Sequence, residues 1–348
     1  MESRPLGRTG LVTPVVAFGG IPVNRVSEAQ GIATVRRCRE LGYRLYDTSR
    51  TYGDSERRVG LGLGEARGQV VLSTKLGPWK VETEADADRF LQESLAALGV
   101  DRVDIYMLKN LDHAENLRRA LELALPAAQR AQRQGLIGHI GMTSHVPEFA
   151  RQALLSGEFG VALLPYSIAN RGHEPVLELC RERGIGVLVM KPLAGGALVE
   201  PEREQGSIRD ALRFCLDHPA VSAVVVGVGS EHEAEVAWEA GEQASPLAPG
   251  ERERLIAAAE SMGTDYCRGC DYCQPCTAGI QIGTILQLAD RVRRFGTDVA
   301  LRDASRDHYR GLEVDGGDCE DCRQCLDRCP FGVAIPERLA QAHELLGG

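Results

Sequence analysis

Two groups of side chains in this sequence have types and spacings that suit redox or acid–base chemistry. The first is a crowd of cysteines: the chain has 11, and eight lie in its last quarter. These eight form two runs, Cys267, Cys270, Cys273 and Cys276, and then Cys319, Cys322, Cys325 and Cys329, which Pro330 follows. Thiolates repeated at such short intervals are ligands for iron and other soft metals, so the runs predict a metal centre.

The second run resembles the C-x2-C-x2-C-x3-C-P pattern of bacterial ferredoxins, whose fourth cysteine ligates the other of two [4Fe–4S] clusters. That resemblance implies two clusters, one held by Cys267, Cys270, Cys273 and Cys329, the other by Cys319, Cys322, Cys325 and Cys276. Zinc, or one cluster beside unligated thiols, are the alternatives. Disulfides are not expected, because the N-terminus lacks the apolar core of a signal peptide.

The second group consists of ionisable residues at the ends of short apolar segments: Asp47, Tyr52, Lys75 and Lys109. An ammonium group near a tyrosine stabilises the phenolate and lowers the tyrosine pKa, and an aspartate can orient the lysine. Such a tyrosine can donate a proton to a carbonyl oxygen that is receiving hydride. The alternative is that Asp47 caps a helix and that Lys75 pairs with a surface acid.

Eight short apolar runs must position these side chains. Each is bounded by Gly, Pro or polar residues, as expected for strands buried on both faces; they are 15–20, 43–48, 70–76, 103–109, 137–143, 161–167, 185–193 and 221–228. Helical patterns lie between them, for example over 85–98 and over 116–132, where Pro126 would kink or interrupt the helix. This alternation predicts an α/β fold, a parallel (β/α)8 TIM barrel with its site at the strand ends.

An open doubly wound sheet is the rival fold. It would be favoured by a glycine fingerprint after the first strand, and Phe18-Gly19-Gly20-Ile21-Pro22 is not one. The glycine-rich segment 60–64 lies in a helical stretch and is interpreted as helix packing.

Residues 47–60, Asp-Thr-Ser-Arg-Thr-Tyr-Gly-Asp-Ser-Glu-Arg-Arg-Val-Gly, resemble the signature of the aldo-keto reductase superfamily. The resemblance covers about residues 3–262, including an N-terminal hairpin that plugs the barrel and a turn at 226–230 that binds phosphate. It implies a barrel that binds NADP(H) or NAD(H) and transfers hydride between the cofactor and a small carbonyl or alcohol substrate. It also implies that Tyr52 is the general acid, that Lys75 tunes it and that Asp47 pairs with Lys75.

Lys109 stands where that family usually has a histidine. An ammonium group there can donate to the carbonyl oxygen, hold a substrate carboxylate or phosphate, or form an imine if its pKa is depressed. The other interpretation is that the replacement of the histidine removes a catalytic group and weakens the enzyme.

The resemblance further implies a cofactor site, made up of Gly20, Asp47, Thr143, Ser144, Met190, Leu193, Gly195, Gly227, Gly229 and Ser230. Several positions depart from the family pattern. Thr143 and Ser144 replace a Ser-Asn pair, and no Arg or Lys follows Gly229 to pair with a 2′-phosphate. NADH and NADPH are therefore both candidates.

The cysteine-rich end predicts two domains, a barrel over 1–262 and a small all-α ferredoxin-like domain over 263–348. A domain of this kind follows the barrel in a subset of aldo-keto reductases, which residues 190–196 also resemble. A helical pattern over 282–309 agrees with it.

Composition narrows the functional class. The chain has 348 residues and a net charge of −9, which makes it a poor nucleic-acid binder, and no apolar run is long enough to cross a membrane. We therefore expect a cytoplasmic oxidoreductase, with a ferredoxin- or flavodoxin-type electron donor as a candidate partner. A cluster-driven redox enzyme that does not use nicotinamide, or a non-catalytic redox sensor, are the alternatives.

Overall fold

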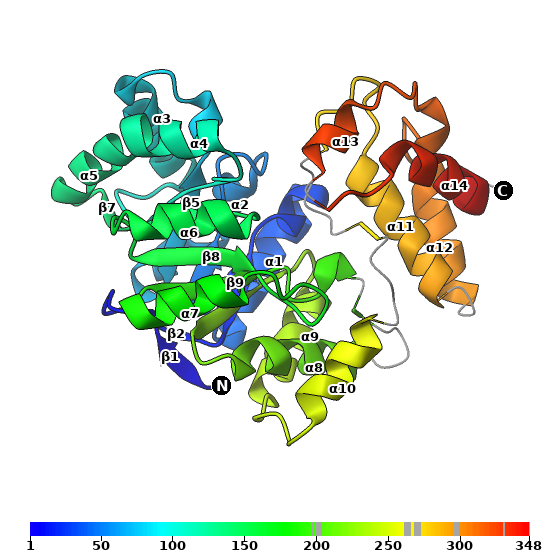
Figure 1. Cartoon of the computed structure of the whole chain (residues 1–348), viewed down its shortest axis with the longest axis horizontal. Helices are drawn as coiled ribbons and strands as arrows, with labels where there is room; N and C mark the ends of the chain where they lie inside the picture. Colours follow the sequence, from blue (N-terminus) through cyan, green and yellow to red (C-terminus); the bar gives the residue numbers. More distant parts are fainter. Residues whose placement is uncertain are drawn as a thin grey trace. The chain divides into compact units, whose positions relative to one another are not determined.

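The structure is a computed structural model that describes residues 1–196, 198–199, 204–260, 266–267, 273–295, 299–329 and 331–347. It separates into two compact units, one of Met1–Pro192 with Ile208–Arg252, the other of Leu193–Ser207 with Glu253–Gly348 (Figure 1). The domain boundary expected near Gly263 lies outside the described residues, so a division at that position stays a prediction.

The first unit contains a closed barrel of eight parallel strands in the order β10-β3-β4-β5-β6-β7-β8-β9, as the sequence predicts. The strands are β3 (Val16–Gly19), β4 (Leu45–Asp47), β5 (Val71–Leu76), β6 (Val103–Leu108), β7 (Ile137–Thr143), β8 (Val161–Pro165), β9 (Gly186–Met190) and β10 (Val221–Gly227). The helices between and after them are α1 (Glu28–Leu41), α2 (Ser55–Leu63), α3 (Glu84–Leu98), α4 (Ala114–Arg119), α5 (Leu125–Arg133), α6 (Pro147–Leu155), α7 (Glu174–Arg183), α8 (Glu204–Asp217), α9 (Glu231–Glu242) and α10 (Glu251–Glu260).

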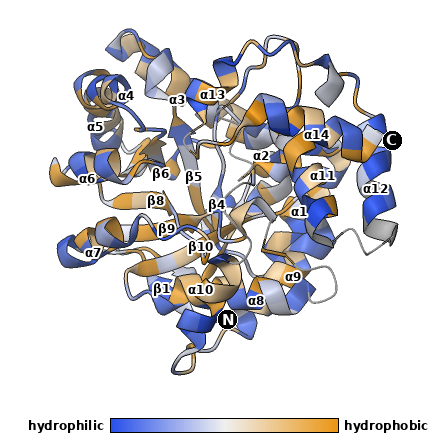
Figure 2. Ribbon diagram, turned by 45° about the vertical axis from the view of Figure 1, so that its right-hand side comes forward, coloured by the Kyte–Doolittle hydropathy of each residue, from blue (hydrophilic) through white to orange (hydrophobic). Residues whose placement is uncertain are grey.

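An antiparallel hairpin of β1 (Ser3–Pro5) and β2 (Val12–Pro14) precedes the barrel. Leu6 in its turn is completely buried and packs with Leu45, Ile105 and other inward-facing strand residues. The strands around this apolar interior are partly orange in Figure 2, and its burial stabilises the barrel. The hairpin and its plugging role therefore agree with the expectation from sequence.

Two local features follow directly from residue type. A Cβ atom on Gly60 would lie 2.2 Å from the carbonyl oxygen of Leu98, so only glycine lets α2 approach the end of α3 this closely. Pro126 has no N–H to donate, and a π turn (η4, Ala120–Ala124) joins α4 to α5 just before it. Both the packing glycine and the interrupted helix were expected.

The described part of the second unit consists of helices: α11 (Ile282–Phe295), α12 (Val299–Arg310), α13 (Gln324–Arg328), α14 (Ile335–Gly347) and the 3-10 turn η7 (Gly316–Asp318). In Figure 1, α11, α12 and α14 lie side by side. They share an apolar core that includes Ile285, Tyr309 and Leu339. None of the helices in the described residues has the length and apolar character needed to cross a membrane.

Candidate active site

A buried ion pair joins the ends of two neighbouring strands of the barrel. Nζ of Lys75, on β5, donates to Oδ2 of Asp47, on β4, at 2.5 Å and to the carbonyl oxygen of Thr48 at 2.6 Å. Ser73 donates its hydroxyl to the other Asp47 oxygen at 2.9 Å. Asp54, and not Asp47, occupies the N-cap position of α2, so the alternative of a capping Asp47 and a surface Lys75 is wrong.

Tyr52 lies beside this pair, in the segment that follows β4. Nζ of Lys75 is 5.1 Å from the centre of the Tyr52 ring, and Nζ of Lys109 is 4.5 Å from it. Burial raises the pKa of Tyr52, and this effect exceeds the lowering by Lys75. The lowering of the tyrosine pKa by an ammonium group, which the sequence predicts, is present, but the loss of solvent, which the sequence does not show, outweighs it.

The pKa values of the two lysines beside Tyr52 are shifted in opposite directions. Burial alone would lower the pKa of Lys75, but the attraction of Asp47 and Tyr52 outweighs it and the pKa is raised. At Lys109, burial and the charge of Lys75 together lower the pKa to about 7, against weaker attraction by Asp47 and other charges. One lysine is thus held as a cation, and the other titrates near neutrality.

Lys109 lies just beyond β6 and is only 6% exposed. Its ammonium group donates to the hydroxyl of Thr51 at 2.6 Å and lies 5.9 Å from the centre of the Trp79 ring. Thr51 and Trp79 were not singled out by sequence reasoning, although Thr51 lies inside the signature segment.

A second polar cluster adjoins Lys109 and joins Ser144 and His145 to Asp112, which the sequence pattern did not single out. Asp112 accepts a hydrogen bond from the backbone N–H of His145 at 2.6 Å and from the hydroxyl of Ser144 at 3.0 Å. Nδ1 of His145 lies 3.4 Å from the other carboxylate oxygen. Burial lowers the pKa of His145 to about 4, so its ring is neutral at pH 7. The position of Asp112, three residues after Lys109, was the signal that could have found it.

His173 interacts electrostatically with the same residues. The charge of Asp112 raises the pKa of His173, and the charge of His173 lowers the pKa of His145. The side chain of His173 is 1% exposed, and burial lowers its pKa to about 4. It precedes α7 directly, and no spacing in the sequence pointed to it. Both histidines therefore lie near Asp112 and carry no positive charge at pH 7.

Thr143 and Ser144, which are expected at the cofactor site, form hydrogen bonds with other parts of the chain. Thr143, the last residue of β7, accepts from the backbone N–H of Asn110 at 3.1 Å. Ser144 donates to the carbonyl oxygen of Leu111 at 2.8 Å, in addition to its contact with Asp112. These hydroxyl groups therefore fasten the loop after β6 to the end of β7, and their part in cofactor binding stays a prediction.

The turn after β10, expected to bind phosphate, carries a carboxylate. The N–H of Gly229 donates to Oε2 of Glu233 at 2.7 Å, and the hydroxyl of Ser230 caps α9 by accepting from the Glu233 N–H at 3.2 Å. Cβ atoms on Gly227 and Gly229 would each lie 3.1 Å from the ring of Pro22. The turn is thus tightly packed, and it has an acid where a 2′-phosphate needs a cation.

The remaining residues expected at the cofactor have separate positions. A Cβ atom on Gly20 would lie 2.8 Å from Oγ of Ser55 and 3.0 Å from the Asp47 carbonyl oxygen, so this glycine packs against the end of β4. Met190 ends β9, and its carbonyl oxygen accepts from the Tyr166 N–H. Leu193 and Gly195 belong to the second unit, where Gln287 donates to the Gly195 carbonyl oxygen at 2.6 Å.

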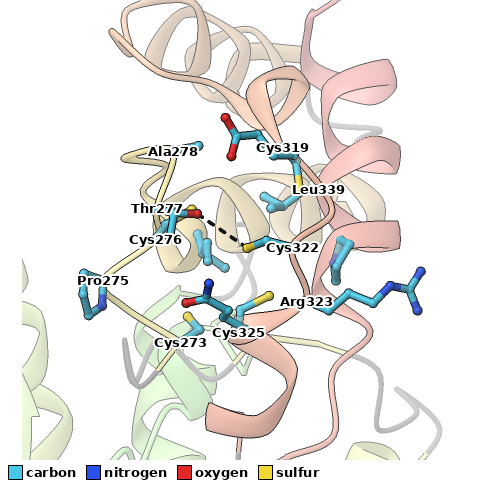
Figure 3. A pocket seen from close by; sticks show the side chains of 14 residues that line it. Cys273, Pro275, Cys276, Thr277, Ala278, Cys319, Cys322, Arg323, Cys325 and Leu339 are labelled. Carbon is cyan, nitrogen blue, oxygen red and sulfur yellow. Dashed lines mark hydrogen bonds between the residues drawn. The ribbon is translucent and has the colours of Figure 1, made fainter.

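The second unit contains a pocket lined by thiols from both cysteine runs (Figure 3). The thiols belong to Cys273, Cys276, Cys319, Cys322 and Cys325. Two hydrogen bonds join the chain segments that carry them. Arg328 donates to the carbonyl oxygen of Pro275 at 2.7 Å, and Oγ1 of Thr277 lies 3.5 Å from Sγ of Cys322. The cysteine-rich runs, which the sequence leaves far apart, therefore meet at one place.

Backbone conformation turns the second run toward that pocket. Asp321 and Arg323, between its first three cysteines, have positive φ angles of 49° and 58°. Such left-handed residues reverse the direction of the chain at each step, so that Cys319, Cys322 and Cys325 all line one pocket.

The other three cysteines of the runs are Cys267, Cys270 and Cys329. The backbone N–H of Cys267 donates to Asp290 of α11 at 2.8 Å, and Cys329 packs against the core of the second unit. Cys270 lies outside the described residues. Among the described ranges, no group of three or more His, Cys, Asp or Glu side chains is arranged to hold a single metal ion. The remaining cysteines, Cys38, Cys180 and Cys215, are completely buried, as expected for core residues.

Comparisons with known proteins identify the barrel. The Aldo/keto reductase family model matches residues 15–211. L-galactose dehydrogenase of Arabidopsis thaliana is 28% identical over 276 residues, which cover 68% of this chain and 86% of that protein. D-threo-aldose 1-dehydrogenase of a Pseudomonas species is 26% identical over 246 residues, which cover 58% and 74%.

Solved structures agree with these sequence comparisons. An aldo-keto reductase from Bacillus halodurans, in its holo form, is 25% identical with a TM-score of 0.63, and the alignment covers 74% of this chain and 96% of that one. The family match contains Asp47, Tyr52, Lys75 and Lys109. The chain therefore belongs to the aldo/keto reductase family and is an oxidoreductase.

Proposed function

We propose that this protein transfers hydride between NAD(P)H and the carbonyl group of a small molecule, with Tyr52 as the general acid, or catalyses the reverse oxidation of the alcohol. The observation that carries this proposal is the buried Lys75–Asp47 pair, at 2.5 Å, beside the Tyr52 ring. A nicotinamide nucleotide, when bound, supplies or accepts the hydride. The names of two relatives, both dehydrogenases of sugars, support this reaction class.

The three residues have distinct parts in the proton step. Burial raises the pKa of Tyr52 and keeps its hydroxyl protonated at neutral pH. When that hydroxyl gives its proton to the carbonyl oxygen, Lys75 stabilises the phenolate that remains. Asp47 holds Lys75 in place and offsets its charge in a region from which water is excluded. In alcohol oxidation the same groups accept the proton.

The chain fits a nicotinamide nucleotide better at the reacting end than at the phosphate end. The Lys75–Asp47 pair and Tyr52 supply the proton-transfer groups, whereas the Glu233 carboxylate already accepts from the Gly229 N–H in the expected phosphate turn. A carboxylate there repels a 2′-phosphate more than it repels a free ribose hydroxyl. We therefore propose that NADH is preferred to NADPH.

The thiol pocket supports a second cofactor. Five thiols from two runs line one pocket. Cys276, Cys319, Cys322 and Cys325 would hold one [4Fe–4S] cluster, and Cys267, Cys270, Cys273 and Cys329 another. Such clusters supply one-electron transfer, for which a ferredoxin- or flavodoxin-type protein would be the partner.

A second candidate function is a cluster-driven redox enzyme that does not use nicotinamide. The internal partners of Ser144 and the carboxylate at Gly229 favour it, because both occupy groups expected to contact the cofactor. Anaerobic purification followed by titration with NADH and NADPH separates the two. Saturable NADH binding and NADH-dependent carbonyl reduction support the first function. If neither nucleotide binds and dithionite-reduced protein turns over a substrate, the first function is wrong.

A further inference from the structure

We propose that the carbonyl substrate carries a carboxylate on the carbon next to the reacting one, and that Lys109 is the cation that pairs with this carboxylate. The proposal rests on the proposed function for the identity of the reacting group, and it adds the chemical class of the substrate. It makes 2-oxo acids, or the corresponding 2-hydroxy acids, the expected substrates.

The position of Lys109 sets where the anionic group must lie. Nζ of Lys109 is 4.5 Å from the centre of the Tyr52 ring, and Nζ of Lys75 is 5.1 Å from the same point. Both ammonium groups therefore lie beside the ring whose hydroxyl would contact the carbonyl oxygen. A carboxylate on the carbon next to the carbonyl is the shortest substrate arrangement that brings one molecule to both Tyr52 and Lys109.

The balance of buried charge shows that this place lacks an anion. Asp47 is engaged by Lys75 and Ser73, and Asp112 by Ser144 and His145. Lys109 forms no ion pair with any side chain that the structure describes, and its ammonium group donates instead to the hydroxyl of Thr51. A buried ammonium group without a counter-charge is unfavourable, and a ligand carboxylate would remove that penalty.

The surroundings of Lys109 favour a small planar anion. The ammonium group lies over the rings of Tyr52 and Trp79, with ring centres 4.5 and 5.9 Å away. Aromatic faces attract the cation but leave its remaining N–H donors for a ligand. The pKa of free Lys109, lowered to about 7, rises when an anion binds, so binding must be coupled to proton uptake.

Calorimetric titration with oxamate tests this inference, because oxamate has a carbonyl group next to a carboxylate and cannot be turned over as a ketone. Oxamide, its neutral amide, is the matched ligand. We expect saturable oxamate binding that weakens about 10- to 100-fold in Lys109→Gln, the loss typical of a charge-assisted hydrogen bond. Lys80→Gln removes an equal charge from an exposed lysine, and should change the dissociation constant less than about 2-fold.

Proton uptake gives a second measurement on the unmodified protein. Repeating the titration at pH 7 in buffers of different ionisation enthalpy should show uptake of about half a proton per oxamate, falling toward zero at pH 5.5. Oxamide and oxamate binding with equal affinity, or unchanged oxamate affinity in Lys109→Gln, would overturn the proposal. So would borohydride trapping of pyruvate on Lys109, because an imine forms by loss of water and leaves no ammonium ion to pair.

The outcomes separate this inference from the proposed function. The oxamate titration is done with and without NADH, and NADH binding is measured independently in the same preparations. Failure of NADH to bind contradicts the nicotinamide function and leaves the oxamate result as a test of Lys109 alone. NADH binding without Lys109-dependent oxamate binding overturns only the substrate class.

Discussion

Nζ of Lys75 lies 2.5 Å from Oδ2 of Asp47, and the two side chains are only 1% and 4% exposed. This ion pair joins the ends of β5 and β4 and fixes a positive charge next to Tyr52. A buried charge that is paired keeps its protonation state over the neutral range, since removing its proton would leave the carboxylate uncompensated. Lys109, on the other side of the tyrosine, has no such partner among the described residues and titrates near pH 7.

Removal of the Tyr52 hydroxyl should abolish most of the proton transfer. We expect Tyr52→Phe to lower kcat about 10²- to 10⁴-fold, the usual contribution of a general acid, with little change in NADH affinity. Tyr46→Phe is the matched control, because the Tyr46 hydroxyl, on β4, is buried with no hydrogen-bond partner in the described part of the chain. Steady-state kinetics and NADH fluorescence measure both. Wild-type turnover by Tyr52→Phe would disprove its role as the acid.

Lys109 should reduce the stability of the free protein at neutral pH. Its folded pKa of about 7 lies below its ordinary value of 10.5, so the unfolded chain binds more protons between these values and stability rises with pH there. We expect Lys109→Met to raise the free energy of unfolding of the barrel by about 2 to 4 kcal/mol at pH 7. The gain should shrink as the pH approaches 10.

Urea unfolding of the two proteins at several pH values measures that difference. Lys80→Met, at an exposed lysine, provides the control and should be within about 0.5 kcal/mol of wild type. A Lys109→Met protein that is less stable than wild type at pH 7 would show that the ammonium group is compensated in the folded chain.

Glu233 should determine part of the cofactor preference. Replacing it with Gln removes the carboxylate that accepts from the Gly229 N–H, and we expect NADPH affinity to increase about 2- to 5-fold, the effect of one exposed charge. NADH affinity should change less, because NADH has no 2′-phosphate. Glu231→Gln changes a neighbouring acid in the same first turn of α9 and serves as the control. If both substitutions change the affinity for NADPH equally, the change comes from the overall charge of the protein and not from the position of Glu233.

The thiol pocket gives a quantitative prediction for iron. Anaerobically purified wild-type protein should contain about eight iron and eight sulfide per chain, and Cys322→Ser should lower both to about four, because one of two clusters loses a ligand. Cys180→Ala, at a completely buried cysteine in α7 of the barrel unit, should keep the wild-type content. Iron analysis and EPR of the reduced proteins check this. A content of one zinc and no sulfide per chain would contradict the two clusters and support a zinc site instead.

The barrel was predictable because its signal is local and repeated. Each of the eight expected apolar runs contains one observed strand, with ends that differ by a few residues, as in β9 (Gly186–Met190) against the expected 185–193. Runs such as Val221 to Val228 cannot alternate polar and apolar residues because both faces are buried, and that continuity is readable from sequence. The meeting of Lys75 and Asp47 then follows from strand order.

Other parts of the site depend on contacts that no periodicity encodes. Asp112 and His173 come from loops, and the position of Asp112 near Lys109 and His173 depends on how those loops pack. The direction of the Tyr52 pKa depended on how much solvent the folded chain excludes, which outweighed the visible charge of Lys75. The Glu233 carboxylate at the Gly229 N–H likewise depends on where α9 begins.

Cys276 and Cys319 line one pocket although α11 and α12 lie between them in the sequence. On the proposed ligand set, a cluster would therefore act as a crosslink that closes a long loop, and its loss would return conformational freedom to that whole helical segment. The barrel has its own apolar interior and no such dependence. The supply of iron would then govern how long the C-terminal part of the chain survives proteases, while the catalytic barrel remains folded.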